Sequence, residues 1–196
     1  MTEERIGGEE TTGKKKPKKS LKRELMEDII MIVFVLITVW VMKNYVLINA
    51  VIPSASMEDT IMTGDRIFGS RLSYEFGGPQ RGDIAIFKFP DDESQLYIKR
   101  VIGLPGERVR IDEQGNIFIN DELLKENYGY ERMEYAGLAA EEIQLGDDEY
   151  FVLGDNRNVS EDSRYPDVGN IKRSNIIGRA WLRIYPFSEF GLLTDK

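Results

Sequence analysis

An apolar run near the N-terminus constrains this chain more than any other feature. Residues 29–42 read IIMIVFVLITVWVM and hold one polar residue, Thr38. A helix that crosses a bilayer needs about 20 mostly apolar residues. The run reaches that length when it continues past Lys43 and Tyr45, because a lysine near a helix end can snorkel and tyrosine favours the membrane interface. We therefore predict a transmembrane anchor over residues 29–48.

Two other interpretations of this run stay open. A cleavable signal peptide has a similar basic flank and apolar length, and a helix buried in a soluble core can be equally apolar. Against the first, residues 1–28 are long for the basic region of a signal peptide. Against the second, the run has no polar face. An uncleaved anchor is the interpretation that we prefer.

The charges around the run predict its orientation. Residues 14–23, KKKPKKSLKR, carry seven of the 26 Lys and Arg of the chain and no acid. Positive residues gather on the cytoplasmic side of a membrane helix. Residues 1–28 are therefore predicted to form a cytoplasmic tail, and residues 49–196 to lie on the outer face of the cytoplasmic membrane. The net charge of −8 argues against nucleic acid as a partner.

Beyond residue 49 the pattern changes to short β-rich runs separated by turns. RGDIAIFKFP, LYIKRVIGLPGE, EYFVLGD and IIGRAWLRIYPF each predict a strand, and RVRIDEQGNIFIN predicts a hairpin around Gly115. Polar and apolar residues alternate, as in sheets with one face in water. The predicted fold class is mainly β, an antiparallel sheet domain after a single N-terminal transmembrane helix. Residues 121–147 are interpreted as a loop with a short helix.

Two residue types are missing from the chain, histidine and cysteine. Without cysteine there is no disulfide, no thiolate nucleophile and no sulfur-ligated metal. Without histidine there is no Ser-His-Asp triad and no imidazole-ligated zinc. Carboxylate sites for magnesium or calcium stay open, and so does serine chemistry with an unusual base.

Ser54 and Ser56 lie one residue apart in IPSASMEDTI, directly after the predicted anchor. A serine hydroxyl is a poor nucleophile until a base removes its proton. Lysine can do so when burial lowers its pKa from about 10.4 toward about 7–8. Lys99, inside the apolar strand run LYIKRVIG, fits best. Lys88, in IFKFP, is the rival, although strand alternation places it opposite two phenylalanines, on what can be the wet face.

Four blocks that follow the anchor resemble the bacterial type I signal peptidases, peptidase S26. They are Ser-x-Ser-Met, RGDIAIF, YIKRVIGLPGE and GDNRNVSEDSR, in this order, and the resemblance extends to IIGRAWLRIYPF. It implies the signal-peptidase fold, with Ser56 as the nucleophile and Lys99 as the general base. It also implies that the Ser54 hydroxyl and the Ser56 backbone N–H form the oxyanion hole.

The last block carries residues that support the site in the family. The resemblance implies that Ser160 hydrogen-bonds Lys99 and positions it, and that Asp162 and Arg164 buttress the site. Asp155 and Asn156 match the opening turn of the block.

The chain departs from the family pattern in two places. The family usually has proline and threonine after SM-x, where Asp59 and Thr60 stand here. It commonly has Asp-Asn before the final-block serine, where Asn158 and Val159 stand. Both departures concern loop geometry and substrate preference, because neither removes a hydroxyl or an amine that the chemistry needs.

The resemblance also implies a function. Members remove signal peptides from exported preproteins and prefer small residues, such as alanine, at positions −1 and −3 before the cut. The family implies no metal and no organic cofactor, whereas the lipid bilayer is an expected partner. Trp181, Tyr185 and Phe187 are either a membrane-facing patch or, as we rather expect, ordinary core residues.

Two alternatives to this function remain. A self-cleaving repressor-type Ser/Lys protease shares the same pair, but it needs a DNA-binding domain for which residues 1–48 leave no room. A catalytically inactive, membrane-anchored β domain could act as a binding module. The presence of Ser54, Ser56, Lys99 and Ser160 together argues against the inactive domain.

Overall fold

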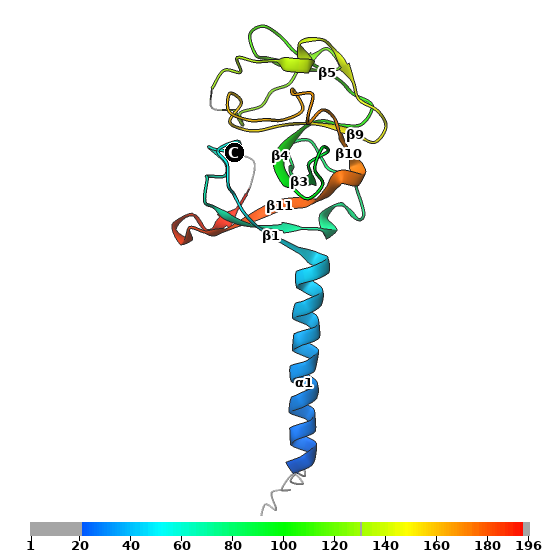
Figure 1. Ribbon diagram of the computed structural model, residues 1–196, viewed down its shortest axis with the longest axis vertical. Helices are drawn as coiled ribbons and strands as arrows, with labels where there is room; N and C mark the ends of the chain where they lie inside the picture. The colour runs from blue at the N-terminus through cyan, green and yellow to red at the C-terminus, as the bar shows by residue number, and fades with distance from the viewer. Residues whose placement is uncertain (1–20, 130, 194–196) are drawn as a thin grey trace, which may run out of the picture. The chain divides into compact units, whose positions relative to one another are not determined.

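The computed structural model describes residues 21–129 and 131–193, and it divides into two compact units, Met1–Trp40 and Val41–Lys196. Helix α1, Leu21–Val41, supplies the described part of the first unit (Figure 1). A π-helical turn, Met42–Val46, follows it. The stretch Leu21–Val46 is long and apolar enough to cross a membrane, and none of α1 is buried. A core helix of a soluble domain would be mostly buried instead.

An eight-stranded sheet forms the larger part of the second unit. Its strands pair in the order β1-β2-β11-β3-β4-β9-β10, with β12 beside β11, and every pair is antiparallel. The strands are β1 Leu47–Val51, β2 Arg66–Ser70, β3 Ile84–Lys88, β4 Leu96–Gly103, β9 Glu149–Leu153, β10 Ile171–Lys172, β11 Ile176–Tyr185 and β12 Gly191–Leu192. The predicted mainly β, antiparallel fold class is thereby confirmed.

A smaller sheet of four strands pairs in the order β7-β6-β5-β8. Its strands are β5 Arg108–Ile111, β6 Ile117–Ile119, β7 Glu122–Leu123 and β8 Ile143–Gln144. The hairpin predicted around Gly115 is confirmed as β5–β6. Residues 121–147 hold the expected short helix, but β7 and β8 were not predicted, because two residues are too few to show a period. The short 3₁₀ turns of the unit are η2 Leu72–Tyr74, η3 Gly137–Ala140, η4 Arg173–Asn175 and η5 Phe187–Glu189.

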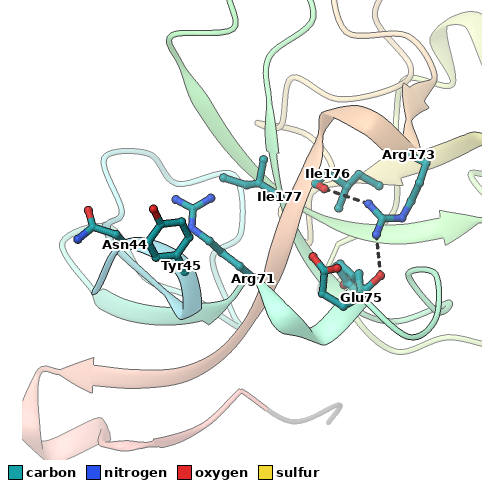
Figure 2. Close-up of a pocket in the computed structure, with 8 residues that line it drawn as sticks. Asn44, Tyr45, Arg71, Glu75, Arg173, Ile176 and Ile177 are labelled. Atoms are coloured by element: carbon teal, nitrogen blue, oxygen red, sulfur yellow. Dashed lines mark hydrogen bonds between the residues drawn. The ribbon is translucent and has the colours of Figure 1, made fainter. Parts of the chain in front are cut away.

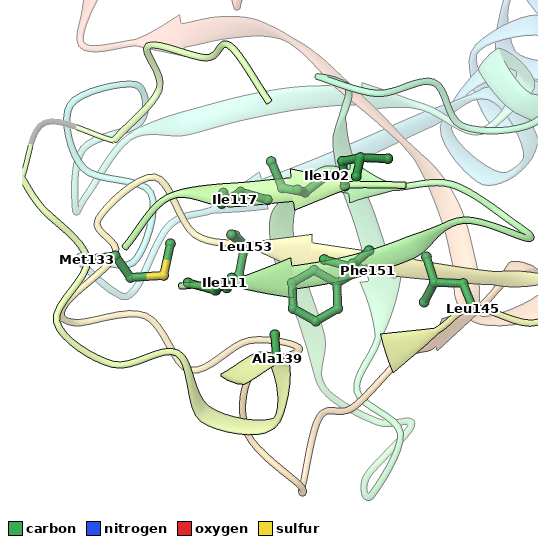
Figure 3. Close-up of a cluster of buried hydrophobic side chains, with 10 residues drawn as sticks. Ile102, Ile111, Ile117, Met133, Ala139, Leu145, Phe151 and Leu153 are labelled. Atoms are coloured by element: carbon green, nitrogen blue, oxygen red, sulfur yellow. The ribbon is translucent and has the colours of Figure 1, made fainter. Parts of the chain in front are cut away.

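The central strands of the large sheet are buried on both faces. In β9, Phe151 and Leu153 pack into a cluster with β5 and β6 (Figure 3), whereas Val152 packs into a second cluster on the other face. Successive side chains of a strand point to opposite faces. The prediction of one wet face therefore fails for β9, because the small sheet covers the face that would otherwise meet water.

A third buried cluster lies under the segment that carries Ser54 and Ser56. Met57 and Ile61 of that segment pack with Ile67 of β2 and with Ile84 and Ile86 of β3. Each of these side chains is at most 3% exposed. This apolar contact fixes the segment against the sheet.

The boundary after the apolar helix differs from the predicted anchor of residues 29–48. Leu47 and Ile48 belong to β1 and pair with Ser70 and Gly69 of β2. The helix already includes Leu21, the first described residue. An apolar sequence such as VLINAVI suits either a helix end or a strand, so pairing with β2 decides between them.

Three aromatic residues near the C-terminal end of the large sheet are exposed. Trp181 and Tyr185 lie on β11, and Phe187 begins η5, with 82% of its surface exposed. The expectation that these three residues fill a core is wrong.

Candidate active site

Ser56 lies in a tight turn that follows β1. Backbone hydrogen bonds close this turn, from Thr60 and Ile61 N–H to the Met57 carbonyl, at 3.1 and 2.7 Å. The backbone N–H of Asn156 donates to the Ser56 carbonyl at 3.1 Å. Ser56 is thus held from one side by its apolar neighbours and from the other by the loop after β9, and it is 9% exposed.

Lys99 projects from β4 onto Ser56. Its Nζ lies 2.8 Å from Ser56 Oγ and the residue is 4% exposed. As an ammonium Lys99 donates this hydrogen bond, and as a neutral amine it accepts the bond from the hydroxyl. The pair therefore has the distance that proton transfer from serine to lysine requires.

Burial lowers the pKa of Lys99 to about 8, because a charged amine loses its hydration there. The negative charges of Asp162, Glu161 and Asp155 act in the opposite direction and raise the pKa. The net result places the lysine near the range that suits a general base at neutral to mildly alkaline pH.

Lys88, the rival base, has a different environment. Its Nζ pairs with Glu93 Oε2 at 2.9 Å, and its side chain is 42% exposed. An exposed, ion-paired side chain of this kind is typical of the wet face of a strand. The two lysines thus differ in burial and in hydrogen-bond partner. Of the two, only Lys99 contacts a serine.

Ser54 stands at the rim of the same site. Its Oγ is 3.4 Å from Ser56 Oγ, and the residue is exposed. Both serines and Lys99 line a cleft of about 570 Å³, together with apolar side chains that include Ile52, Ile86 and Ile98. The hydroxyl of Ser54 can therefore reach a peptide bound in front of Ser56.

Ser160 is buried close to the pair but does not make the predicted contact. Its Oγ has no hydrogen-bond partner among the described residues, and Lys99 Nζ is bonded to Ser56 instead. A Cβ added at Gly154 would collide with Ser160 Oγ and with the Ser56 carbonyl oxygen. Gly154 was not predicted as a site residue, although its place at the head of the GDN turn is a signal for close backbone approach.

Asp162 and Arg164 form a buried ion pair behind the site. Arg164 Nε donates to Asp162 Oδ1 at 2.8 Å, and both side chains are fully buried. Asp162 Oδ2 accepts from the Gly154 N–H at 3.0 Å, and Arg164 Nη2 donates to the carbonyls of Arg157 and Ser160. The pair holds the shape of the loop 154–164 and does not contact Ser56.

Arg100, the residue after Lys99, is a site residue that sequence reasoning missed. Its guanidinium makes a bidentate ion pair with Asp155, at 2.8 and 2.7 Å, and reaches Thr60 Oγ1 at 3.4 Å. It therefore ties β4 to the loop after β9 and to the turn of Ser56. An arginine inside an apolar strand needs a buried acid as a partner, and this was the available signal.

We expect Asp162→Asn to lower the free energy of unfolding by about 3–5 kcal/mol, because removing one partner leaves the Arg164 charge buried and unpaired. Urea unfolding of the two proteins measures the difference. The matched control is Lys88→Gln, which removes an exposed ion pair and should cost less than about 1 kcal/mol. Equal losses for both variants would show that the buried ion pair stabilises the fold no more than the exposed one does.

Among the described residues, no group of three or more acidic side chains is arranged to hold a metal ion. The site consists of hydroxyls, one amine and backbone N–H groups. Such a set can deprotonate a hydroxyl, attack a carbonyl and stabilise an oxyanion.

Comparison with known proteins gives a consistent set of relatives. Residues 25–185 match the family profile described as signal peptidase, peptidase S26. The chain is 42% identical over 151 residues to the protein named "Probable signal peptidase I-2" of Synechocystis sp., and the match covers 74% of this chain and 66% of that protein. It is 41% identical over 149 residues to the signal peptidase I of Leptolyngbya laminosa, covering 72% and 70% of the two chains.

A more distant relative covers more of the sequence. Signal peptidase IB of Staphylococcus aureus is 30% identical over 187 residues, which cover 87% of this chain and 94% of that protein. The family profile spans most of the chain, from α1 to the end of β11. The chain therefore belongs to the signal peptidase family, peptidase S26, and is a hydrolase of the serine peptidase class.

Proposed function

We propose that this protein removes N-terminal signal peptides from exported preproteins, with Ser56 as the nucleophile and Lys99 as the general base. The observation that carries the proposal is the 2.8 Å contact between Ser56 Oγ and a buried lysine amine, in a chain without histidine. The lowered pKa of Lys99 supports the same role, because only the neutral amine can accept a proton.

The proposed reaction proceeds through an acyl-enzyme. Neutral Lys99 accepts the hydroxyl proton while Ser56 Oγ attacks the scissile carbonyl carbon. The Ser54 hydroxyl and the Ser56 backbone N–H stabilise the resulting oxyanion. The Lys99 ammonium then gives its proton to the leaving amine. A water molecule, deprotonated by Lys99, hydrolyses the ester and regenerates the serine.

Asp162, Arg164 and Ser160 have supporting roles in this proposal. Asp162 and Arg164 keep the loop after β9 in place, and that loop holds the Ser56 carbonyl through the Asn156 N–H. Ser160 is close enough to the Ser56 segment to exclude a side chain at Gly154. We propose that Ser160 orients the Lys99 amine once substrate is bound, as the family resemblance implies.

The apolar helix supports a membrane-anchored enzyme. In this proposal residues 1–28 are cytoplasmic, residues 29–48 contain the anchor, and residues 49–196 act on the outer face of the membrane. The basic cluster before the helix supports this orientation. Tyr185 and Phe187 are exposed, and their ring centroids lie 5.9 Å apart. Such an exposed aromatic pair supports a catalytic unit that works near the lipid surface.

Cleavage of a preprotein with alanine at positions −1 and −3 tests the proposed substrate class. We expect replacement of the −1 alanine by phenylalanine to lower kcat/KM by about 100-fold or more, because a bulky side chain displaces the scissile carbonyl from Ser56. Cleavage is followed by mass spectrometry of both products, which also locates the cut. Replacement of a residue ten positions downstream is the control.

Two outcomes would contradict this proposal. Equal rates for the alanine and phenylalanine substrates would contradict the proposed preference for a small residue at position −1. A wild-type protein that binds several preproteins but cuts none would favour the inactive binding module.

A further inference from the structure

A second cavity lies in the same unit as the active site and shares no lining residue with its cleft. Its volume is about 360 Å³. The π-helical turn Met42–Val46, η2 and the start of β11 surround it (Figure 2). Its polar lining includes two arginines, Arg71 and Arg173, and one acid, Glu75.

Arg71 presents a guanidinium that has no acceptor. Its side chain makes no hydrogen bond and no ion pair with any residue in the described part of the chain, and its Nε is buried. The backbone of Arg71 is nevertheless fixed, because its N–H donates to the Val46 carbonyl at 2.8 Å. In Figure 2 the guanidinium lies between Tyr45 and Ile177. The residue as a whole is half-buried, but its buried Nε–H without an acceptor costs free energy, so the site favours an anion that can accept that hydrogen bond.

Arg173 adds a second positive charge that the protein does not neutralise. Its guanidinium donates to the carbonyls of Tyr74 and Ile176, at 2.8 and 3.2 Å, and it forms no ion pair within residues 21–129 and 131–193. These carbonyl contacts fix the orientation of the group and leave its charge in place. Glu75 is exposed and pairs with neither arginine among the described ion pairs. The lining therefore carries two cations and one anion.

We propose that this pocket binds the phosphate group of an anionic ligand, with Arg71 as the principal donor. Guanidinium groups match phosphate oxygens with paired hydrogen bonds, and they are less costly to bury than an ammonium. A free phosphate or the headgroup of a phospholipid supplies the same chemistry.

The position of the pocket in the chain favours a phospholipid as the source. Asn44 and Tyr45, which line it, belong to the last turn of the candidate membrane span Leu21–Val46. Tyrosine is enriched at the depth of the lipid headgroups. The lipid source thus rests on the anchoring part of the proposed function, whereas binding of phosphate itself does not depend on it.

Binding to the full-length protein in dodecyl maltoside micelles tests the proposal. One arm titrates inorganic phosphate, and the other titrates dihexanoylphosphatidylglycerol, with both followed by ³¹P NMR line broadening. We expect Arg71→Gln to weaken binding by roughly tenfold to a hundredfold, because it removes charge-assisted hydrogen bonds to the phosphate. The matched control is Arg66→Gln, which removes an exposed arginine at the start of β2, the strand that ends just before Arg71, and which lies outside the pocket. It should bind like the wild type.

Each result has a defined meaning. Arg71-dependent binding of the lipid alone identifies a headgroup site, and Arg71-dependent binding of inorganic phosphate alone identifies a soluble phosphate ligand. Binding in neither arm, or equal binding by wild type and Arg71→Gln, overturns the proposal. If Arg71→Gln does not fold, Arg71→Lys takes its place, since it keeps the charge and loses the paired hydrogen bonds. The readout is binding, so a failure of the Ser56–Lys99 proposal would leave this result unaffected.

Discussion

Replacement of Ser56 by alanine is expected to lower kcat for preprotein cleavage by about a millionfold, the size of effect seen when a serine peptidase loses its nucleophile. Ser56 Oγ is the atom that Lys99 Nζ contacts, at 2.8 Å. Its backbone is held by the Asn156 N–H and does not depend on the hydroxyl. The variant should therefore fold and bind substrate while the chemical step fails. Single-turnover cleavage with excess enzyme measures this step directly.

Two comparison variants separate the nucleophile from its neighbours. Thr63→Ala removes an exposed hydroxyl of the same loop, which donates to Glu58 at 3.0 Å, and should leave the rate unchanged. Ser54→Ala should lower kcat by about 10²–10³-fold, the effect of losing one oxyanion donor. A Ser56→Ala protein that retains more than about one-hundredth of the wild-type rate would assign the attack to another hydroxyl.

The long, well-marked strands could be predicted from the sequence. IAIFK and LYIKRVIG are long β-rich runs bounded by Pro or Gly, and they form β3 and β4 as expected. The hairpin of β5 and β6 follows from Gly115, which has a φ of +81° at the turn. In these segments the local turn chemistry and the tertiary pairing favour the same structure.

Strand β1 could not be predicted, because its sequence continues the apolar run of the helix. LINAV suits a helix end as well as a strand, and only its pairing with β2 distinguishes them. The strands β7 and β8 are too short for any periodic signal. Aromatic residues such as Phe187 resemble core residues in composition alone, and only their place on the exposed turn η5 shows otherwise.

The residues of the candidate site could be proposed from the sequence, but their geometry could not. Ser56 and Lys99 are 43 positions apart, so no local spacing could place them together, and the order of four sequence blocks carried the prediction. The buried ion pair of Arg100 and Asp155 depends on β4 lying beside β9, which no single block reveals. For Ser160 the sequence implied a contact that is missing. Its place in a block implied a hydrogen bond to Lys99, but its Oγ has no hydrogen-bond partner among the described residues.

Lys99 should give the enzyme a distinctive pH dependence. Its pKa is lowered to about 8 by burial, and only the neutral amine can accept the Ser56 proton. We therefore expect kcat/KM to rise with pH through a midpoint near 8 and to level off above it. Lys99→Met should abolish cleavage across this range, whereas Lys88→Met, which removes an exposed ion-paired amine, should retain it. Loss of activity in Lys88→Met alone would reverse the assignment of the base.

Lys99→Met should also stabilise the fold. This effect tests the lowered pKa of Lys99 without any substrate. Below pH 8 both the folded and the unfolded protein carry a charged Lys99, so the cost of burying the charge is fully present. Between about pH 8 and 10.5 the folded state releases the proton first, and the stability of the wild type rises. At roughly 1.4 kcal/mol per pKa unit, the cost below pH 8 is roughly 3 kcal/mol.

Lys99→Met removes this cost, because a thioether side chain of similar length is neutral at every pH. We expect a higher unfolding temperature than wild type at pH 7, and a gain that shrinks as the pH approaches 10.5. Thermal unfolding of the full-length proteins in detergent, at several pH values, measures both trends, with Lys88→Met as a control that should show neither. A Lys99→Met protein that is less stable than wild type at pH 7 would mean that the fold stabilises the ammonium. In that case the amine would hold its proton too tightly to activate Ser56 near neutral pH.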